Sequence, residues 1–459
     1  MTALPPAAPR PPFWHDPFVR GLLYQVLVLG GCVAAFLYIF NNTLTNLRAR
    51  GIASGYGFLS NEAGFAISEV LPIPLPEGGV LVFLLTVGAG LLLTWGLARS
   101  LRRKGRALGD DTRTALLVVT LLVVAPALVL YFGWGEIHTE SYTEASSYRI
   151  ALVTGLLNTL KVSLLGCALA TLLGVFVGLC RLSSNWLVSR LALAYIEGIR
   201  NIPLLVQIFF WYHAVLRNLP DVQESHRWGQ AYLNNRGVFL PRPDPRPGFE
   251  WVLAALLLAG VLIYFRARHA RRRQDATGEQ LPVLWPALAA LLLLPGAAWL
   301  LAGQPVRLSF PVLEGFNFQG GMVLSPEYAA LLAGLVSYTS AFIAEIVRSG
   351  IAAVDRGQRE AAQALGLRAG RRMRLVVLPQ ALRVIVPPLT SQYLNLTKNS
   401  SLGVAIAFPE LVSVSGTILN QSGQAIEVIG ITMAVYLTFS LLISLGMNWY
   451  NARVRLVER

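Results

Sequence analysis

Long apolar blocks alternate with short polar segments along the chain. The blocks contain about 20 residues, which is the length that a helix needs to cross the hydrocarbon core of a bilayer. Ten candidate spans follow one another, at residues 19–40, 79–99, 113–133, 151–180, 191–216, 251–265, 282–302, 326–350, 379–398 and 425–450. The pattern predicts an all-α polytopic membrane protein with about ten transmembrane helices.

The amino-acid composition supports this prediction. Of the 459 residues, 54% are hydrophobic and 14% are charged, whereas an ordinary soluble domain carries about 25% charged residues. Cys32, Cys167 and Cys180 all fall inside apolar blocks, and no HExxH, GxSxG or paired-cysteine pattern occurs. We therefore exclude a soluble enzyme, and we expect no catalytic residues, no metal site and no cofactor in this chain.

The net charge of +14 is distributed in a way that predicts the orientation. With the N-terminus in the cytoplasm, the basic segments 102–106 and 266–273 lie inside, together with the basic C-terminal tail. The segment 134–147, which has acidic but no basic residues, then lies outside. Cytoplasmic loops collect Arg and Lys, so both termini are predicted to be cytoplasmic. The charge does not indicate binding to nucleic acid, and the first span is expected to remain uncleaved.

Three segments are not predicted to span. Residues 41–78 and 217–250 are expected to be loops on the outer side, the second of them rich in Pro and Arg. Residues 399–424 are apolar but are interrupted by glycines and by Pro409. Irregular backbone at membrane depth is tolerated only where protein buries it or where it lines a cavity. We therefore predict a short interrupted helix on the outer side.

The polar segment 355–388 joins the eighth and ninth spans on the predicted cytoplasmic side. Asp355 is placed to cap a helix, and Gln358 three residues later would complete a capping box. Gly366 is placed to end this helix as a C′ glycine, with Leu367 as its hydrophobic partner. On these residues alone, the short helix is either an amphipathic connector on the membrane surface or a docking helix with a small-residue face.

The order of Glu360-Ala361-Ala362, Gly366 and Leu378-Pro379 resembles the EAA signature of ABC importer permeases. In that family the EAA helix is the coupling helix, which binds in a groove of a separate ATP-binding subunit. The resemblance therefore favours docking. It implies an ATPase-coupling role for Arg359, Glu360, Ala361, Ala362, Leu365, Gly366, Leu378 and Pro379.

More of the chain resembles the polar amino-acid (histidine/glutamate/arginine-type) branch of these permeases. The motifs are Asn158-Thr159-Leu160 and the stretches 200–207, 344–348 and 398–402. The resemblance implies a five-helix type I permease core in two parts, 151–216 and 326–459, the second of which contains the EAA coupling loop.

The enlarged layout is similar to that of the general L-amino-acid permease subfamily, as are the stretches 54–59, 63–65 and 416–425. In this layout residues 1–150 form an N-terminal extension with three transmembrane helices and a periplasmic loop. Residues 217–325 form an insertion with two transmembrane helices.

The resemblance implies a permease subunit of an ATP-driven importer of L-amino acids, polar or broad in range, in a bacterial inner membrane. None of the three lysines follows a glycine, so no P-loop is present and ATP with Mg²⁺ belongs in a partner ATPase. The implied partners are an ATP-binding subunit, a second permease subunit that is related but not identical, and a periplasmic amino-acid-binding protein. An ATP-independent secondary transporter or channel for small polar solutes, or a membrane scaffold, remains the alternative.

Polar residues inside the spans are candidates for the translocation path, because burying them in a membrane is costly. They are Asn158, Gln207, Glu345, Asn395 and Asn399. The amides could equally form hydrogen bonds between helices, and Glu345 could pair with Arg348 at the cytoplasmic end of its helix. Lys161 and Lys398 are expected to extend toward an interface.

Overall fold

The computed structural model describes residues 17–49, 55–70, 73–75, 138–246, 248–279 and 281–454. Within these ranges, seven helices are long and apolar enough to cross a membrane, or up to eight if one bent pair counts as a span. The chain is thus mostly helical, as the apolar blocks predict. The predicted spans 79–99 and 113–133 lie outside the described residues, so the total of ten remains a prediction.

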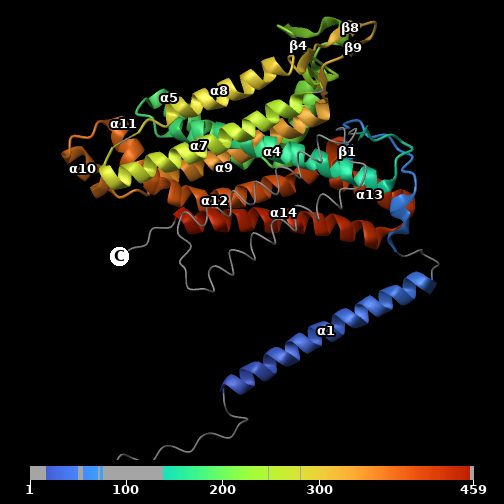
Figure 1. Cartoon of the computed structure of the whole chain (residues 1–459). Coiled ribbons are helices and arrows are strands. Elements are labelled where there is room, and N and C mark those ends of the chain that lie inside the picture. Colours follow the sequence, from blue (N-terminus) through green and yellow to red (C-terminus); the bar gives the residue numbers. More distant parts are fainter. Residues whose placement is uncertain are drawn as a thin grey trace, which may run out of the picture.

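Four long helices form the core and lie side by side (Figure 1). They are α4 (Tyr148–Arg181), α9 (Pro326–Ala352), α12 (Leu378–Asn399) and α14 (Ala425–Val454). Small residues let α4 and α9 approach closely: a Cβ at Gly174 would lie 2.6 Å from Ile343 Cβ and 2.8 Å from the Ser340 carbonyl oxygen. Such close backbone approach is how helices gain packing energy in lipid.

The predicted span 191–216 is a bent pair and not one straight helix. Helix α5 (Trp186–Asn201) is followed by α6 (Leu204–Phe209), which continues through the π-helical turn η3 (Phe210–Val215) and the 3₁₀ turn η4 (Leu216–Asn218). The two parts are bent by 105° at Ile202–Pro203. Pro203 lacks a backbone N–H and disfavours helical backbone in the residue before it, which explains why the helix stops here.

The all-α prediction is wrong for the insertion, which contains short strands. In one sheet the strand order is β10 (Met322–Leu324), β5 (Gly237–Leu240), β4 (Ala231–Asn234) and β3 (His226–Trp228). Two more antiparallel pairs lie in the insertion: β6 (Arg242–Pro245) with β7 (Val306–Ser309), and β8 (Val312–Glu314) with β9 (Asn317–Gln319). A further pair among the described residues, β1 (Ile73–Leu75) with β2 (His138–Glu140), lies in the N-terminal extension. Strands of three or four residues are too short to show an alternating pattern in the sequence.

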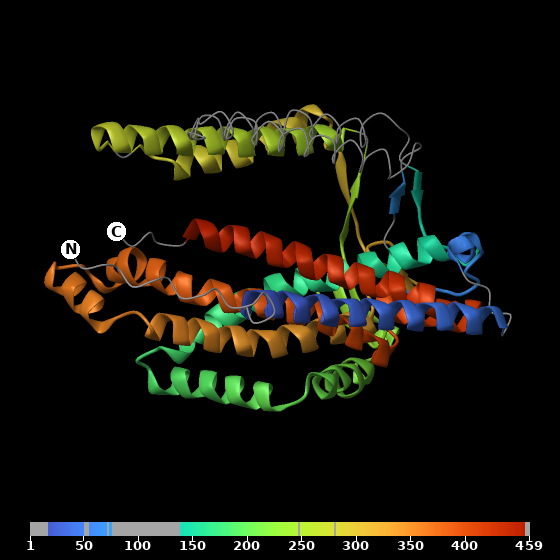
Figure 2. The ribbon, with the colours of Figure 1, turned by 90° about the horizontal axis from the view of Figure 1, so that it is seen from below.

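The sheet forms because α7 (Phe249–Thr277) and α8 (Leu284–Leu301) make a helical hairpin. The hairpin returns the chain to its starting end, so that β5 and β10, far apart in the sequence, become neighbours. Figure 2 shows the hairpin on one side of the molecule, joined to the core through strands. Helix α7 is longer than predicted and carries the basic segment 266–273 on helical turns instead of a loop.

The remaining elements differ less from expectation. Helix α1 (Pro17–Ala49) is longer than the predicted span 19–40 and stands apart from the core in Figure 1. The predicted interrupted helix is confirmed as the 3₁₀ segment η7 (Ser400–Ile406) and helix α13 (Leu411–Ser422). The short 3₁₀ turns η2 (Tyr56–Ser60) and η5 (Val222–Glu224) lie in the predicted loops.

Candidate functional site

Helix α10 (Arg356–Ala364) occupies one end of the core, opposite the strands (Figure 1). The predicted N-cap is confirmed, because Asp355 Oδ1 accepts a hydrogen bond of 2.6 Å from the Gly357 amide. Gln358 does not close a capping box; its side-chain oxygen is instead 3.5 Å from Gln380 Nε2 on α12. This contact places the first turn of α10 against α12.

The predicted C-terminal glycine of α10 is also confirmed. Gly366 has φ +73°, a left-handed conformation that favours glycine. The Leu367 amide donates to the Ala362 carbonyl at 3.1 Å, and the Gly366 amide donates to the Gln363 carbonyl at 2.9 Å. These two bonds are the Schellman pattern, which satisfies the last carbonyls of a helix.

Two further contacts attach α10 to the core. Arg359 Nη2 donates to the carbonyl of Ile351, at the end of α9. After α10, the chain continues through α11 (Ala369–Arg372) and the π-helical turn η6 (Met373–Val377) directly into α12. Helices α9 and α12 pack so closely that Ile385 leaves no room for a Cβ at Gly350. Helix α10 is therefore attached to two helices that pack against each other.

One face of α10 is exposed and built of small residues. Ala362 is buried, whereas Ala361 and Ala364 are exposed, and Leu365 is 81% exposed. Glu360 is exposed beside this face and pairs with Arg356 at 2.8 Å. A small-residue face with a projecting leucine allows a close approach of another protein to the helix backbone.

Among the other predicted coupling residues, Leu378 and Pro379 begin α12 and are exposed. They therefore lie on the same end of the core as α10, and all eight predicted residues belong to one continuous stretch at that end.

The five predicted path residues do not form one site. Asn158 is buried at the end of the core opposite α10, where its amide donates to the carbonyls of Glu69 and Pro409, both at 2.9 Å. Glu345 pairs with Arg348 at 2.5 Å. It lies about 30 Å from the start of α9, toward α10, given a rise of 1.5 Å per residue. The two side chains are thus at different depths of the core.

Gln207 supports the bend between α5 and α6. Its Nε2 donates to the carbonyls of Ile199 and Ile202, both at 2.9 Å. Both carbonyls lie where the helix is interrupted. The Ile199 carbonyl also accepts a long bond of 3.4 Å from the Ile202 amide, whereas Gln207 is the partner that the Ile202 carbonyl gains here. Asn395 is exposed on α12 and Asn399 is half-buried at its end.

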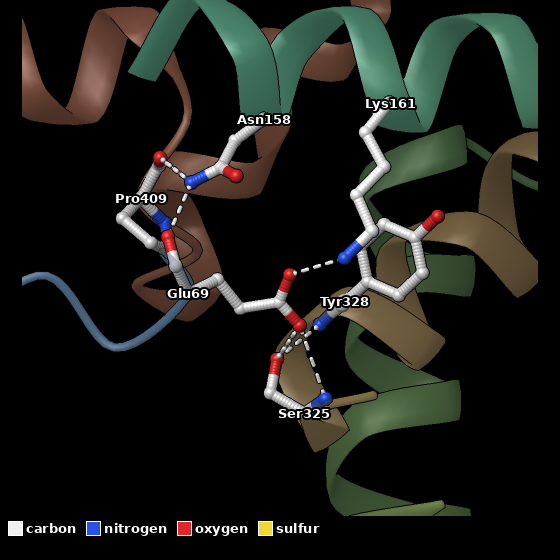
Figure 3. A network of polar contacts seen from close by, with 6 residues as sticks. All are labelled: Glu69, Asn158, Lys161, Ser325, Tyr328 and Pro409. Carbon is white, nitrogen blue, oxygen red and sulfur yellow. Dashed lines mark hydrogen bonds and ion pairs between the residues drawn. The ribbon is translucent and has the colours of Figure 1, made fainter. Parts of the chain in front are cut away.

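Sequence reasoning missed Glu69, which is buried and lies 2.8 Å from Lys161 Nζ (Figure 3). Lys161 does not extend to an interface as predicted. The sequence did indicate that Lys161 has a partner, because a lysine in the middle of an apolar span is costly without one. The sequence did not show that the partner lies in the N-terminal extension. Within the described part of the chain, no three His, Cys, Asp or Glu side chains are grouped as a metal site.

The described residues thus form a bundle of candidate membrane spans with a short, capped and exposed helix between two of them. Residues 170–456 match the family model of the binding-protein-dependent transport system inner membrane component. The match covers more than half of the chain, and the chain belongs to this family.

Relatives of similar length support this assignment. The chain is 43% identical over 447 residues to YhdX of Escherichia coli (strain K12), covering 97% of this chain and 96% of that protein. It is 41% identical to the general L-amino acid transport system permease protein AapQ of Rhizobium johnstonii, covering 97% and 94%. It is 36% identical to the glutamate/glutamine/aspartate/asparagine transport system permease protein BztB of Rhodobacter capsulatus, covering 97% and 96%.

Proposed function

We propose that this chain is the permease subunit of an ATP-driven importer of L-amino acids, polar or broad in range. The observation that carries the proposal is α10, a helix capped at both ends, exposed along a small-residue face and attached to two long helices. The substrate class is supported by the relatives, since AapQ is named for general L-amino acid transport and BztB for transport of four related amino acids.

In this proposal ATP and Mg²⁺ are bound by a separate ATPase chain. The coupling residues are Arg359, Glu360, Ala361, Ala362, Leu365, Gly366, Leu378 and Pro379. The exposed members of this set contact the ATPase, and Ala362, which is buried in this chain, does not. Movement of the ATPase displaces α10. The contact of Arg359 with α9 and the direct connection to α12 pass this displacement into the core. Because α9 and α12 pack tightly at Gly350, they move together.

The wider assembly follows from the same proposal. The chain contains ten spans with both termini in the cytoplasm of a bacterium. It pairs with a second, related permease subunit and receives substrate from a periplasmic binding protein. Residues 1–150 and 217–325 are an extension and an insertion around a core at 151–216 and 326–459. Asn158, Gln207, Glu345, Asn395 and Asn399 are proposed to border the path.

Replacing Glu360 by Lys tests the coupling role. The complete importer, reconstituted in liposomes, is expected to lose about tenfold in ATP-dependent uptake, because the exposed face of α10 changes from an acidic to a basic edge. Glu314→Lys, in the strand β8 far from α10, is the matched control and should leave uptake unchanged. Undiminished uptake by the Glu360→Lys importer would refute coupling through α10.

A second variant tests the helix end. Gly366→Ala forces alanine into a left-handed conformation at a cost of about 1–2 kcal/mol and should lower substrate-stimulated ATP hydrolysis. Gly370→Ala, in the adjacent α11, is the control because this glycine has neither a positive φ nor a close neighbour. Uptake by this chain alone, without any ATPase, would instead establish the ATP-independent alternative.

A further inference from the structure

The carboxylate of Glu69 lies at the end of the core opposite α10, where the N-terminal extension meets α4 and α9. It accepts hydrogen bonds from Lys161 Nζ at 2.8 Å and from the amide and hydroxyl of Ser325 at 3.2 and 3.0 Å (Figure 3). The Glu69 side chain is only 7% exposed. These contacts join the extension to two helices of the core.

The donors form an anion site that the core itself provides. Ser325 is the N-cap of α9, and its hydroxyl oxygen accepts from the Tyr328 amide at 3.1 Å. A helix N-terminus carries partial positive charge, which favours a carboxylate. Lys161 Nζ also lies 4.2 Å from the centre of the Tyr328 ring, so this ring helps to hold the ammonium group. Glu69 therefore fills a site that is complementary to its charge.

The backbone of Glu69 reaches a third part of the core. Its carbonyl accepts from Asn158 Nδ2, and the same amide group donates to the carbonyl of Pro409. Pro409 lies in the linker between η7 and α13, and the next residue, Glu410, caps α13. The extension, α4, α9 and this linker are thus connected through one residue and its immediate partners.

Other contacts hold the segment 55–70 in place without Glu69. The Gly55 amide donates to Glu427 Oε1 at 2.8 Å, and the Ala63 amide donates to the Ser146 carbonyl at 2.8 Å. The Tyr142 hydroxyl donates to the Phe65 carbonyl at 2.5 Å. Burial, with the nearby charge of Glu144, raises the pKa of Tyr142 to about 12, so it remains a donor. Attaching the segment therefore does not by itself explain the buried charge.

We propose that Glu69 is a positioning residue for transport, and that the N-terminal extension uses it as a latch on the core. The latch holds α4, α9 and the linker before α13 together at the end opposite α10. A transporter must open at each end in turn, and packed elements move as discrete units. When this end opens, at least one of the Glu69 contacts breaks. The inference rests on the proposed ATP-driven function.

Glu69→Gln in the complete importer tests the latch. Glutamine keeps the size of the side chain and one acceptor oxygen. It replaces the other oxygen by an NH2 donor and removes the charge that Lys161 and the α9 N-terminus bind. The variant is expected to assemble normally, to hydrolyse more ATP without substrate and to transport about tenfold less amino acid per ATP. Glu69→Asp, which keeps the charge on a shorter side chain, should transport more amino acid per ATP than Glu69→Gln but less than the wild type.

Glu62→Gln is the matched control. Glu62 lies in the same segment and is exposed, and its backbone forms an isolated bridge with Ser147. This variant should transport as the wild type does. A Glu69→Gln importer with wild-type uptake per ATP would overturn the proposal.

The double variant Glu69→Gln with Lys161→Met distinguishes two roles of the Glu69–Lys161 ion pair: a latch that acts in transport, and a pair that only stabilises the fold. Replacing both members of a buried ion pair by uncharged groups is often neutral for stability. A stabilising role alone predicts that the double variant regains wild-type uptake per ATP, and that result would also overturn the proposal. The latch predicts that uptake per ATP stays low. If the wild-type complex itself shows no substrate-stimulated ATP hydrolysis, the proposed function fails instead.

Discussion

Gln207 shows, at the scale of single residues, how one polar side chain can stabilise an interrupted helix. Pro203 starts a new helix direction, and at this point the Ile199 carbonyl keeps only a long bond from the Ile202 amide, at 3.4 Å. Gln207 is buried and donates to both carbonyls, while its own oxygen is 3.4 Å from the Ser337 hydroxyl on α9. The side chain therefore links the bend to the core.

Replacing Gln207 by Leu should destabilise the chain by roughly 1–3 kcal/mol, because the Ile202 carbonyl loses its partner. The measurement is the thermal unfolding midpoint of the purified protein in detergent. Gln223→Leu, at an exposed position of the short turn η5, is the control and should shift the midpoint little. Equal midpoints for the two variants would show that the bend does not depend on Gln207.

At the scale of helices, the close packing of α4 against α9 contributes to the stability of the fold. At Gly174 the nearest neighbours of an added Cβ are the branched Ile343 side chain and the backbone carbonyl of Ser340. Neither can move aside without shifting a helix, so Gly174→Ala should cost about 1–3 kcal/mol through overpacking. Gly198→Ala in α5 meets no atom within 4 Å and should gain up to about 1 kcal/mol from helix propensity. Opposite shifts of the unfolding midpoint are expected.

The sequence predicts those elements whose ends are determined by neighbouring residues, such as helix α10. Asp355 and Gly366 lie at the two ends of α10 and determine where it begins and ends, so both were readable from the sequence. The long apolar helices of the described residues also coincide with apolar blocks of the sequence. What the sequence did not show are contacts between distant segments, such as the pairing of β5 with β10 and of Glu69 with Lys161. The β5–β10 pairing forms only because the α7–α8 hairpin brings the chain back to the core, and the Glu69–Lys161 pair forms only because the N-terminal extension packs on the core.

At the scale of the whole molecule, the two ends of the core differ in character. One end carries α10 and the basic turns around Arg371 and Arg374, and the other carries the strands and the Glu69 network (Figures 1 and 3). If basic residues mark the cytoplasmic side, the α10 end faces the cytoplasm, which is also where ATP is available.

Cysteine labelling tests this orientation. Leu365, which directly follows α10, is 81% exposed, and Trp228 on β3, toward the other end, is 70% exposed. After Cys32, Cys167 and Cys180 are replaced by Ala, Leu365→Cys and Trp228→Cys each provide one reactive position. A membrane-impermeant maleimide is expected to label Trp228→Cys from outside the cytoplasmic membrane and Leu365→Cys only in inverted vesicles. Labelling in the reverse pattern would contradict the orientation and, with it, the access of an ATPase to α10.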